Sequence, residues 1–139
     1  MARTLGKIRD VLAAQRALLA ARRRLDREPV GSLTARRGDA PAPAPSGDAT
    51  RARQIAAAVR WTARHGLFRP FCLVQALALQ ELLAAAGVRG SEIRVGVQRQ
   101  DGQFAAHAWV RWNNEVLGDD PRHVATFTEV DDIGVLGRR

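Results

Sequence analysis

Residues 69–83 read Arg-Pro-Phe-Cys-Leu-Val-Gln-Ala-Leu-Ala-Leu-Gln-Glu-Leu-Leu, a pattern typical of a helix that begins near a proline and is buried on most sides. Pro70 suits a first turn, because the N–H that proline lacks would be unpaired there anyway. The apolar side chains that follow would cover almost the whole circumference of the helix. We therefore expect a buried helix over residues 71–86, ended by Gly87, with the only cysteine of the chain, Cys72, at its N-terminus.

Two more helices are expected before this one. Asp48 or Thr50 can cap a helix over residues 51–65, and Gly66 can close it. Within residues 4–28, arginines lie opposite one broad apolar stripe with helical spacing, which predicts an amphipathic helix. The stripe consists of Leu5, Ile8, Val11, Leu12, Leu18, Leu19 and Leu25.

After the buried helix, the pattern changes to that of a sheet. Residues 92–99 alternate apolar side chains with polar or small ones, which is typical of a half-buried strand. Asp101-Gly102 predicts a tight hairpin to a partner strand over residues 104–112, and Asn113-Asn114 predicts a second turn. Two further strands are expected, over residues 115–118 and 124–130. Helices followed by an antiparallel meander predict an α+β fold.

The 139 residues are enough for one domain with an appendage. Residues 38–50 alternate proline with alanine and are typical of a semi-rigid, exposed linker. We therefore expect three parts: an N-terminal basic amphipathic helical region over residues 1–37, this Pro/Ala-rich linker, and the main domain over residues 51–139.

Positive charge is concentrated near the N-terminus. The formal net charge is +8, and residues 1–39 hold ten basic side chains against four acidic ones. Such a segment is either a solvated arginine-rich face or a docking surface for an acidic partner or nucleic acid. No helix-turn-helix, zinc-finger or RNA-binding aromatic motif accompanies the charge, so we expect no nucleic-acid partner.

The composition also indicates the compartment. A single cysteine cannot form an intramolecular disulfide, so nothing favours an oxidising environment. The charged first residues do not resemble a secretory signal, and the longest nearly uncharged stretch, residues 70–80, is too short to span a bilayer. We expect a cytoplasmic protein that does not bind membranes.

Cys72 is the candidate nucleophile. The thiolate, not the thiol, attacks a carbonyl carbon, and the unpaired N–H groups and the dipole of a helix N-terminus favour negative charge. The same N–H groups can hold the oxyanion of a tetrahedral intermediate. The alternative is that Cys72 is a small buried apolar residue, as many free cysteines are.

His107 is the candidate base. Ala105, His107 and Trp109 share one face of the predicted strand. An imidazole beside the start of the cysteine helix could take the thiol proton and later give it to a leaving amine. The alternative is a structural histidine. Trp109 could form a wall of the cleft, although tryptophans of this kind more often pack in a core.

Asp119 is the candidate that orients the imidazole. It lies one short hairpin beyond His107, where its carboxylate could accept the second imidazole N–H. Asp120 is the alternative, although its side chain would point to the opposite face if the strand continued. Either aspartate could instead cap the turn at Asp-Asp-Pro. We favour Asp119.

No metal or cofactor is expected. His65 and His123 have no partner pattern and are expected to be structural. One cysteine and three scattered histidines lack the ligand spacing of a metal site. No glycine-rich phosphate loop occurs, so the chain should not itself bind ATP.

Several of these segments, taken together, resemble a known family. They are Phe-Cys-Leu-Val-Gln-Ala-Leu-Ala-Leu at 71–79, Gly87-Val88, Val95-Gly96-Val97, Ala106-His107-Ala108-Trp109-Val110, and Asp119. Over about residues 52–130, the chain is similar to the transglutaminase-like leader peptidases of lasso-peptide biosynthesis. It resembles more closely the stand-alone peptidase half of the split maturation protein.

This resemblance implies a papain-like or transglutaminase-like core, in which a buried helix with the cysteine at its N-terminus packs on a small antiparallel sheet. It implies a cysteine protease that removes the leader peptide from a ribosomally made precursor, with Cys72, His107 and Asp119 as nucleophile, base and orienter. The implied partners are the precursor, a small leader-recognition protein and an ATP-dependent macrolactam cyclase. A transglutaminase-type acyl transferase and a non-catalytic peptide-binding module of the same fold are the alternatives.

Overall fold

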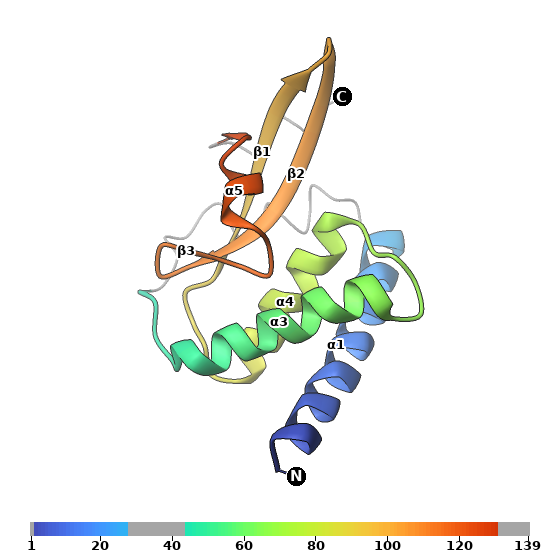
Figure 1. Cartoon of the computed structure of the whole chain (residues 1–139), viewed down its shortest axis with the longest axis vertical. Helices are drawn as coiled ribbons and strands as arrows, with labels where there is room; N and C mark the ends of the chain where they lie inside the picture. The colour runs from blue at the N-terminus through green and yellow to red at the C-terminus, as the bar shows by residue number, and fades with distance from the viewer. Residues whose placement is uncertain (1, 28–43, 131–139) are drawn as a thin grey trace.

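The computed structural model describes residues 2–27 and 44–130. Three helices, α1 (Ala2–Arg27), α3 (Ala49–His65) and α4 (Cys72–Ala85), gather at one end of the molecule, beside a four-stranded antiparallel sheet (Figure 1). A long hairpin of the sheet extends away from the helices. This arrangement confirms the predicted α+β fold with an N-terminal helix.

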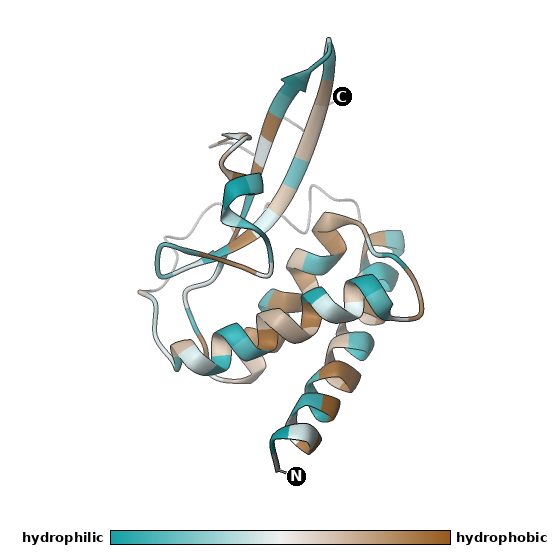
Figure 2. Cartoon of the chain, viewed as in Figure 1, coloured by the Kyte–Doolittle hydropathy of each residue, from teal (hydrophilic) through white to brown (hydrophobic). Residues whose placement is uncertain are grey.

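Helix α4 lies at the centre of the core. It packs against α1, α3 and the sheet, because its apolar side chains leave no polar face for solvent. Figure 2 shows hydrophobic residues along this helix where it lies behind α3. The predicted burial on most sides is confirmed by its buried residues, Val74, Ala76, Leu77, Ala78, Leu79 and Leu83.

Helix α3 begins where one of its two predicted caps places it. The Asp48 carboxylate accepts hydrogen bonds from the backbone N–H groups of Thr50, at 2.9 Å, and Arg51, at 3.4 Å. The helix therefore starts two residues earlier than predicted. Gly66 closes it as expected, and its N–H donates to the Thr62 carbonyl oxygen.

The sheet contains both predicted tight turns. β1 (Glu92–Gln100) and β2 (Gln103–Trp112) form the long hairpin, and β3 (Glu115–Leu117) pairs with β2. The backbone φ angles are 53° and 79° at Asp101 and Gly102, and 50° and 61° at Asn113 and Asn114. Two successive positive φ values are what a two-residue hairpin turn of this hand requires.

The predicted strand over residues 124–130 is wrong at its start. Asp120 caps a short helix, α5 (Pro121–Val124), and Pro121 suits its first turn. These two residues favour a helix at the start of the segment instead of a strand. Only β4 (Thr128–Glu129) is a strand. It pairs with β1 at the edge opposite β3, giving the order β3-β2-β1-β4 rather than a simple meander.

Helix α1 contributes to the same core. Ala14, Leu18 and Ala21 are buried against the other helices. Leu5, Ile8 and Leu12, however, are 61%, 51% and 56% exposed. The broad apolar stripe predicted for this helix is therefore only partly covered: one edge of it packs in the core, whereas these three side chains stay exposed.

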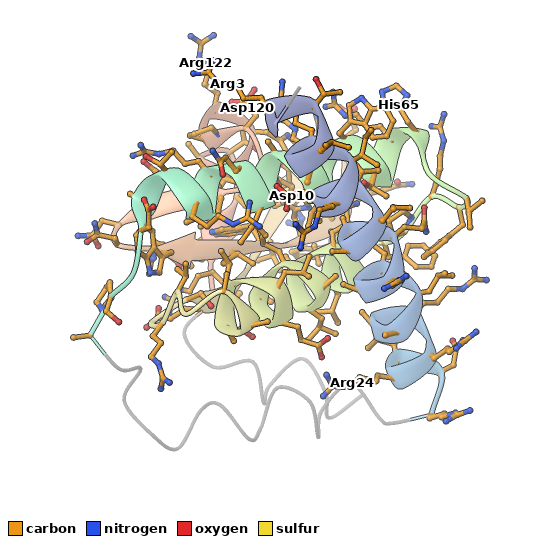
Figure 3. The ribbon with its side chains drawn as sticks, turned by 90° about the horizontal axis from the view of Figure 1, so that it is seen from below. Arg3, Asp10, Arg24, His65, Asp120 and Arg122 are labelled. Atoms are coloured by element: carbon orange, nitrogen blue, oxygen red, sulfur yellow. The ribbon has the colours of Figure 1, made fainter. Side chains whose placement is uncertain are left out.

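Two ion pairs fix α1 to its neighbours. Asp10 pairs with Arg51 of α3, and Arg24 pairs with Glu81 of α4. Figure 3 shows Asp10 where α1 crosses α3. The Arg51 guanidinium donates two hydrogen bonds of 2.8 Å to the carboxylate. These hydrogen bonds lower the pKa of Asp10.

The residues that would connect α1 to α3 lie partly outside the described chain. Residues 38–43 of the predicted linker are among them. In the described part of the linker, Ser46 pairs with Arg89 as an isolated bridge. The division into residues 1–37, 38–50 and 51–139 stays a prediction. Within the described ranges, no helix combines the length and the apolar character needed to cross a membrane.

Candidate active site

Cys72 is the first residue of α4. The residue before it, Phe71, has an extended backbone and provides no side-chain hydrogen bond to the helix N-terminus. The first N–H groups of a helix have no partner within the helix, and that of Gln75 is the first to bond back, to the Phe71 carbonyl oxygen. No side chain of the described residues caps these N–H groups. The Cys72 side chain lies beside them and is half-buried.

His107 and Asp119 are brought together by the pairing of β2 with β3. Val110 lies opposite Leu117, the last residue of β3, so Asp119 follows two residues later, beside the part of β2 that carries His107. Gly118 has a φ of 75°, a left-handed conformation that a side chain disfavours. The turn directs Asp119 toward the imidazole, and His107 Nε2 lies 2.5 Å from Asp119 Oδ2. Both side chains are mostly shielded from solvent, at 18% and 22% exposed.

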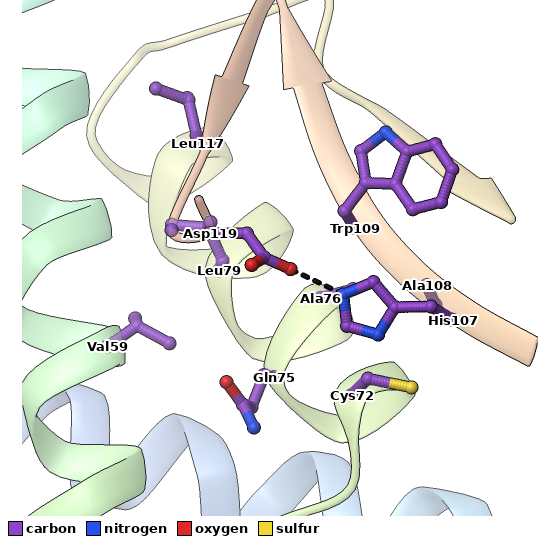
Figure 4. A pocket seen from close by; sticks show the side chains of 11 residues that line it. Val59, Cys72, Gln75, Ala76, Leu79, His107, Ala108, Trp109, Leu117 and Asp119 are labelled. Atoms are coloured by element: carbon purple, nitrogen blue, oxygen red, sulfur yellow. Dashed lines mark hydrogen bonds and ion pairs between the residues drawn. The ribbon is translucent and has the colours of Figure 1, made fainter. Parts of the chain in front are cut away.

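One cleft contains all three predicted site residues. Figure 4 shows the Asp119 carboxylate bonded to Nε2 of His107, whereas the other ring nitrogen, Nδ1, faces Cys72. Within the described residues, the thiol forms no hydrogen bond with the imidazole. The cleft is lined by Val59, Cys72, Gln75, Ala76, Leu79, His107, Ala108, Trp109, Leu117, Gly118 and Asp119.

Asp120 has a different environment from Asp119. Its carboxylate accepts the Arg122 backbone N–H at 2.9 Å and caps α5. Its side chain is exposed and does not line the cleft. The sequence favours Asp119 over Asp120, and in the structure Asp119 is the one that contacts the histidine.

Aromatic rings surround the imidazole. The Phe127 ring stacks on His107 with centroids 5.2 Å apart, and the Trp109 ring lies 6.0 Å away at a similar tilt. His123 approaches edge-on at 5.1 Å. Trp109, 5% exposed, lines the cleft as the sequence suggested.

Sequence reasoning missed two neighbours of His107 and one of Cys72. The sequence predicts a structural role for His123 and a strand position for Phe127. No local signal shows that α5 and the residue just before β4 reach the imidazole. Gln75 was detectable, because it stands three residues after Cys72 and so lies on the same helix face. Its amide Nε2 donates to the Pro70 carbonyl oxygen at 3.0 Å, which ties the start of α4 to the preceding turn.

The described residues contain no group of three or more histidine, cysteine, aspartate or glutamate side chains that could hold a metal ion. The chemistry that this arrangement supports is proton transfer between a thiol and an imidazole, with a carboxylate on the far side of the ring. Such a set of groups can form and break a thioester.

The sequence also matches a family model, described as the transglutaminase-like superfamily, over residues 11–131. The chain belongs to the transglutaminase-like superfamily. The match begins within α1, so it covers more of the chain than the similarity over residues 52–130 that the motifs indicate. No curated protein and no solved structure matches the chain. Transglutaminase-like proteins include cysteine proteases, and the superfamily is also consistent with acyl transfer.

Proposed function

We propose that this protein is a cysteine peptidase that removes the leader from a ribosomally made lasso-peptide precursor. The observation that carries the proposal is the single cleft shared by Cys72, His107 and Asp119, with the histidine and aspartate side chains in direct contact. Membership of the transglutaminase-like superfamily and the motif resemblance around these residues support the same reaction class.

In the proposed mechanism, His107 Nδ1 takes the proton from the Cys72 thiol. Sγ then attacks the carbonyl carbon at the junction between leader and core peptide, and the peptide C–N bond breaks. His107 gives its proton to the leaving amine, and a thioester remains on Cys72. The imidazole next takes a proton from water, whose oxygen attacks the thioester, and the thiol and a carboxylic acid are released.

Asp119 and the start of α4 act on the charges that develop. The Nε2–H group of His107 donates to Asp119, which holds the ring with Nδ1 toward the thiol and favours the imidazolium formed after proton transfer. The Cys72 backbone N–H is the proposed donor to the oxyanion of each tetrahedral intermediate, because the helix N-terminus leaves it unpaired.

The partners follow from the family resemblance. A small leader-recognition protein would present the precursor to the cleft, and a separate ATP-dependent cyclase would close the macrolactam on the released core. We also propose that the protein acts in the cytoplasm, as the sequence leads us to expect.

The deciding experiment is incubation of the full chain with its precursor peptide, with and without the recognition protein, followed by mass spectrometry. Hydrolysis yields two fragments that together have gained one water. A transglutaminase-type reaction instead joins the peptide to a second chain or to a small amine, and ammonia is lost. Hydrolysis by the wild-type chain and none by Cys72→Ala support the peptidase. Ammonia loss would replace it with acyl transfer.

Thiol reactivity tests whether the cleft is catalytic at all. We expect Cys72 of the wild-type chain to be alkylated by iodoacetamide faster than Cys72 of His107→Ala, because the imidazole no longer removes the proton in the variant. Equal, slow alkylation of both proteins, together with peptide binding, would favour a non-catalytic binding module.

A further inference from the structure

The outer face of α1 carries an apolar row that no other described residue covers. Leu5, Ile8 and Leu12 are all more than half exposed, and their spacing of three and then four residues places them on one side of the helix. The buried residues of α1, such as Leu18, lie on a different side. In Figure 1 the N-terminal part of α1 projects beyond α3 and α4.

The spacing of this row is that of a helix–helix seam. Leu5, Ile8, Leu12, Gln15 and Leu19 follow the alternating three- and four-residue steps of a heptad pattern. Gln15 accepts a hydrogen bond from the Leu67 backbone N–H at 3.0 Å, so the loop after α3 reaches this position. The free part of the seam therefore runs from Leu5 to Leu12.

Arginines border the row on one side. Arg9 follows Leu5 by four residues and Arg16 follows Leu12 by four, so each guanidinium can lie beside a leucine of the row. Both arginines are exposed, and neither forms an ion pair with any residue in the described ranges. In a heptad pattern, positions beside the seam choose the partner through their charge.

These features select one kind of occupant. A second copy of the chain would bring two arginine rows together in an antiparallel pair, and in either orientation it would join two proteins of net charge +8, so self-association is disfavoured. Nucleic acid would use the arginines but not the apolar row. A membrane-surface helix typically has a broad apolar face with aromatic residues, whereas this row is narrow and aliphatic.

We propose that residues 5–16 of α1 dock an amphipathic helix of another protein, whose own apolar row meets Leu5, Ile8 and Leu12 and whose acidic residues pair with Arg9 and Arg16. None of the residues that line the cleft comes from α1, so this surface can be occupied while a peptide is bound at Cys72. The proposal does not depend on the reaction proposed for the cleft.

The probe is a synthetic helical peptide of about three heptads, with leucine at both seam positions and glutamate at the flanking positions. Binding is followed by NMR on methyl-labelled full chain. We expect saturable shifts of the Leu5, Ile8 and Leu12 methyl groups. The same peptide with lysine in place of glutamate should bind at least tenfold more weakly, as should the acidic peptide with alanine at the seam.

Two double variants test the two parts of the surface. One double variant combines Leu5→Ser with Leu12→Ser, and the other combines Arg9→Glu with Arg16→Glu. Each should weaken binding of the acidic peptide about tenfold. Phe104→Ser and Arg99→Glu are the matched controls, because both residues are exposed at the tip of the β1–β2 hairpin, on the part of the sheet that extends away from the helices. All variants change exposed residues, and circular dichroism checks that each is folded.

Several results would overturn the proposal. They are the absence of saturable binding, equal binding of the alanine-seam peptide, or equal weakening by the control variants. Sedimentation with phosphatidylcholine–phosphatidylserine vesicles that is lost in the leucine variant, without peptide binding, would assign the surface to lipid. A dimer of the wild-type chain that the leucine variant dissociates would assign it to self-association.

Discussion

At the scale of single residues, two adjacent aspartates have separate structural tasks. Asp119 contacts the ring of His107, whereas Asp120 caps α5. The left-handed turn at Gly118 allows this division, because it changes the direction of the chain just before Asp119. The candidate site is therefore built by backbone geometry as much as by the identity of its side chains.

We predict that Asp119→Asn lowers the rate of precursor cleavage by about 10²–10⁴-fold. The amide can hold the ring but does not stabilise an imidazolium, and it can fix the wrong tautomer. Single-turnover assays on the precursor measure the effect. Asp120→Asn is the matched control, and it should keep the wild-type rate, since asparagine also caps helices well. A larger loss in Asp120→Asn would transfer the orienting role to that residue.

At the scale of elements, the edge strand β4 completes the surroundings of His107. Pairing with β1 places Gly96 opposite Glu129 and brings Phe127 onto the imidazole. Gly96 is buried, and a Cβ there would lie 2.8 Å from both the Phe127 Cβ and the Trp109 ring. The missing side chain thus provides the space in which the two aromatic residues flank the histidine.

We predict that Gly96→Ala destabilises the protein by about 1–3 kcal/mol, because the added methyl group overpacks this site, and that it also slows cleavage. Urea unfolding measures the first effect and the precursor assay the second. Gly6→Ala in α1 is the control: nothing lies within 4 Å of the added Cβ, and alanine favours a helix, so stability should stay equal or rise. An unchanged Gly96→Ala protein would show that the aromatic rings have room to move.

At the scale of the whole molecule, the second half of α1 is part of the core, although its first turns project from it. Its buried residues belong to the same hydrophobic cluster as those of α3 and α4, and the family match begins within it. Removing the helix would expose this core. A test of partner binding therefore needs substitutions on its outer face rather than truncation.

We predict that Asp10→Asn lowers the free energy of unfolding by about 1 kcal/mol at pH 7, the range of a well-formed bidentate pair with arginine. The hydrogen bonds from Arg51 lower the pKa of Asp10 in the folded protein, so its contribution is complete above the unfolded value of about 3.9. This contribution to stability is lost as the pH falls through the lower pKa that Asp10 has in the folded protein. Urea titrations of both proteins between pH 7 and pH 3 should therefore converge at low pH.

The matched control for this pair is Glu115→Gln. The pKa of Glu115 is likewise lowered by a hydrogen bond from an arginine, Arg53, but that pair lies at the surface and solvent screens it. We expect a smaller loss of stability in this variant. A difference between wild type and Asp10→Asn that stays constant down to pH 3 would contradict an ionic origin.

Much of the fold follows from local patterns in the sequence. The uniformly apolar run after Pro70, the Asp48 cap and the two turn pairs each determine a structure within a few residues, because capping, backbone φ and periodicity act over one or two turns of chain. The candidate nucleophile, base and orienter could be named for the same reason: each stands at the end or on one face of such an element.

Tertiary structure alone decided the remaining features. The crossing of β4 to the far edge of the sheet, which brings Phe127 and His123 to His107, depends on pairing with β1 and leaves no local trace. In α1, one apolar sequence supplies both a buried and an exposed face. Periodicity shows that side chains share a side of a helix, but only packing against α3 and α4 determines which side is covered.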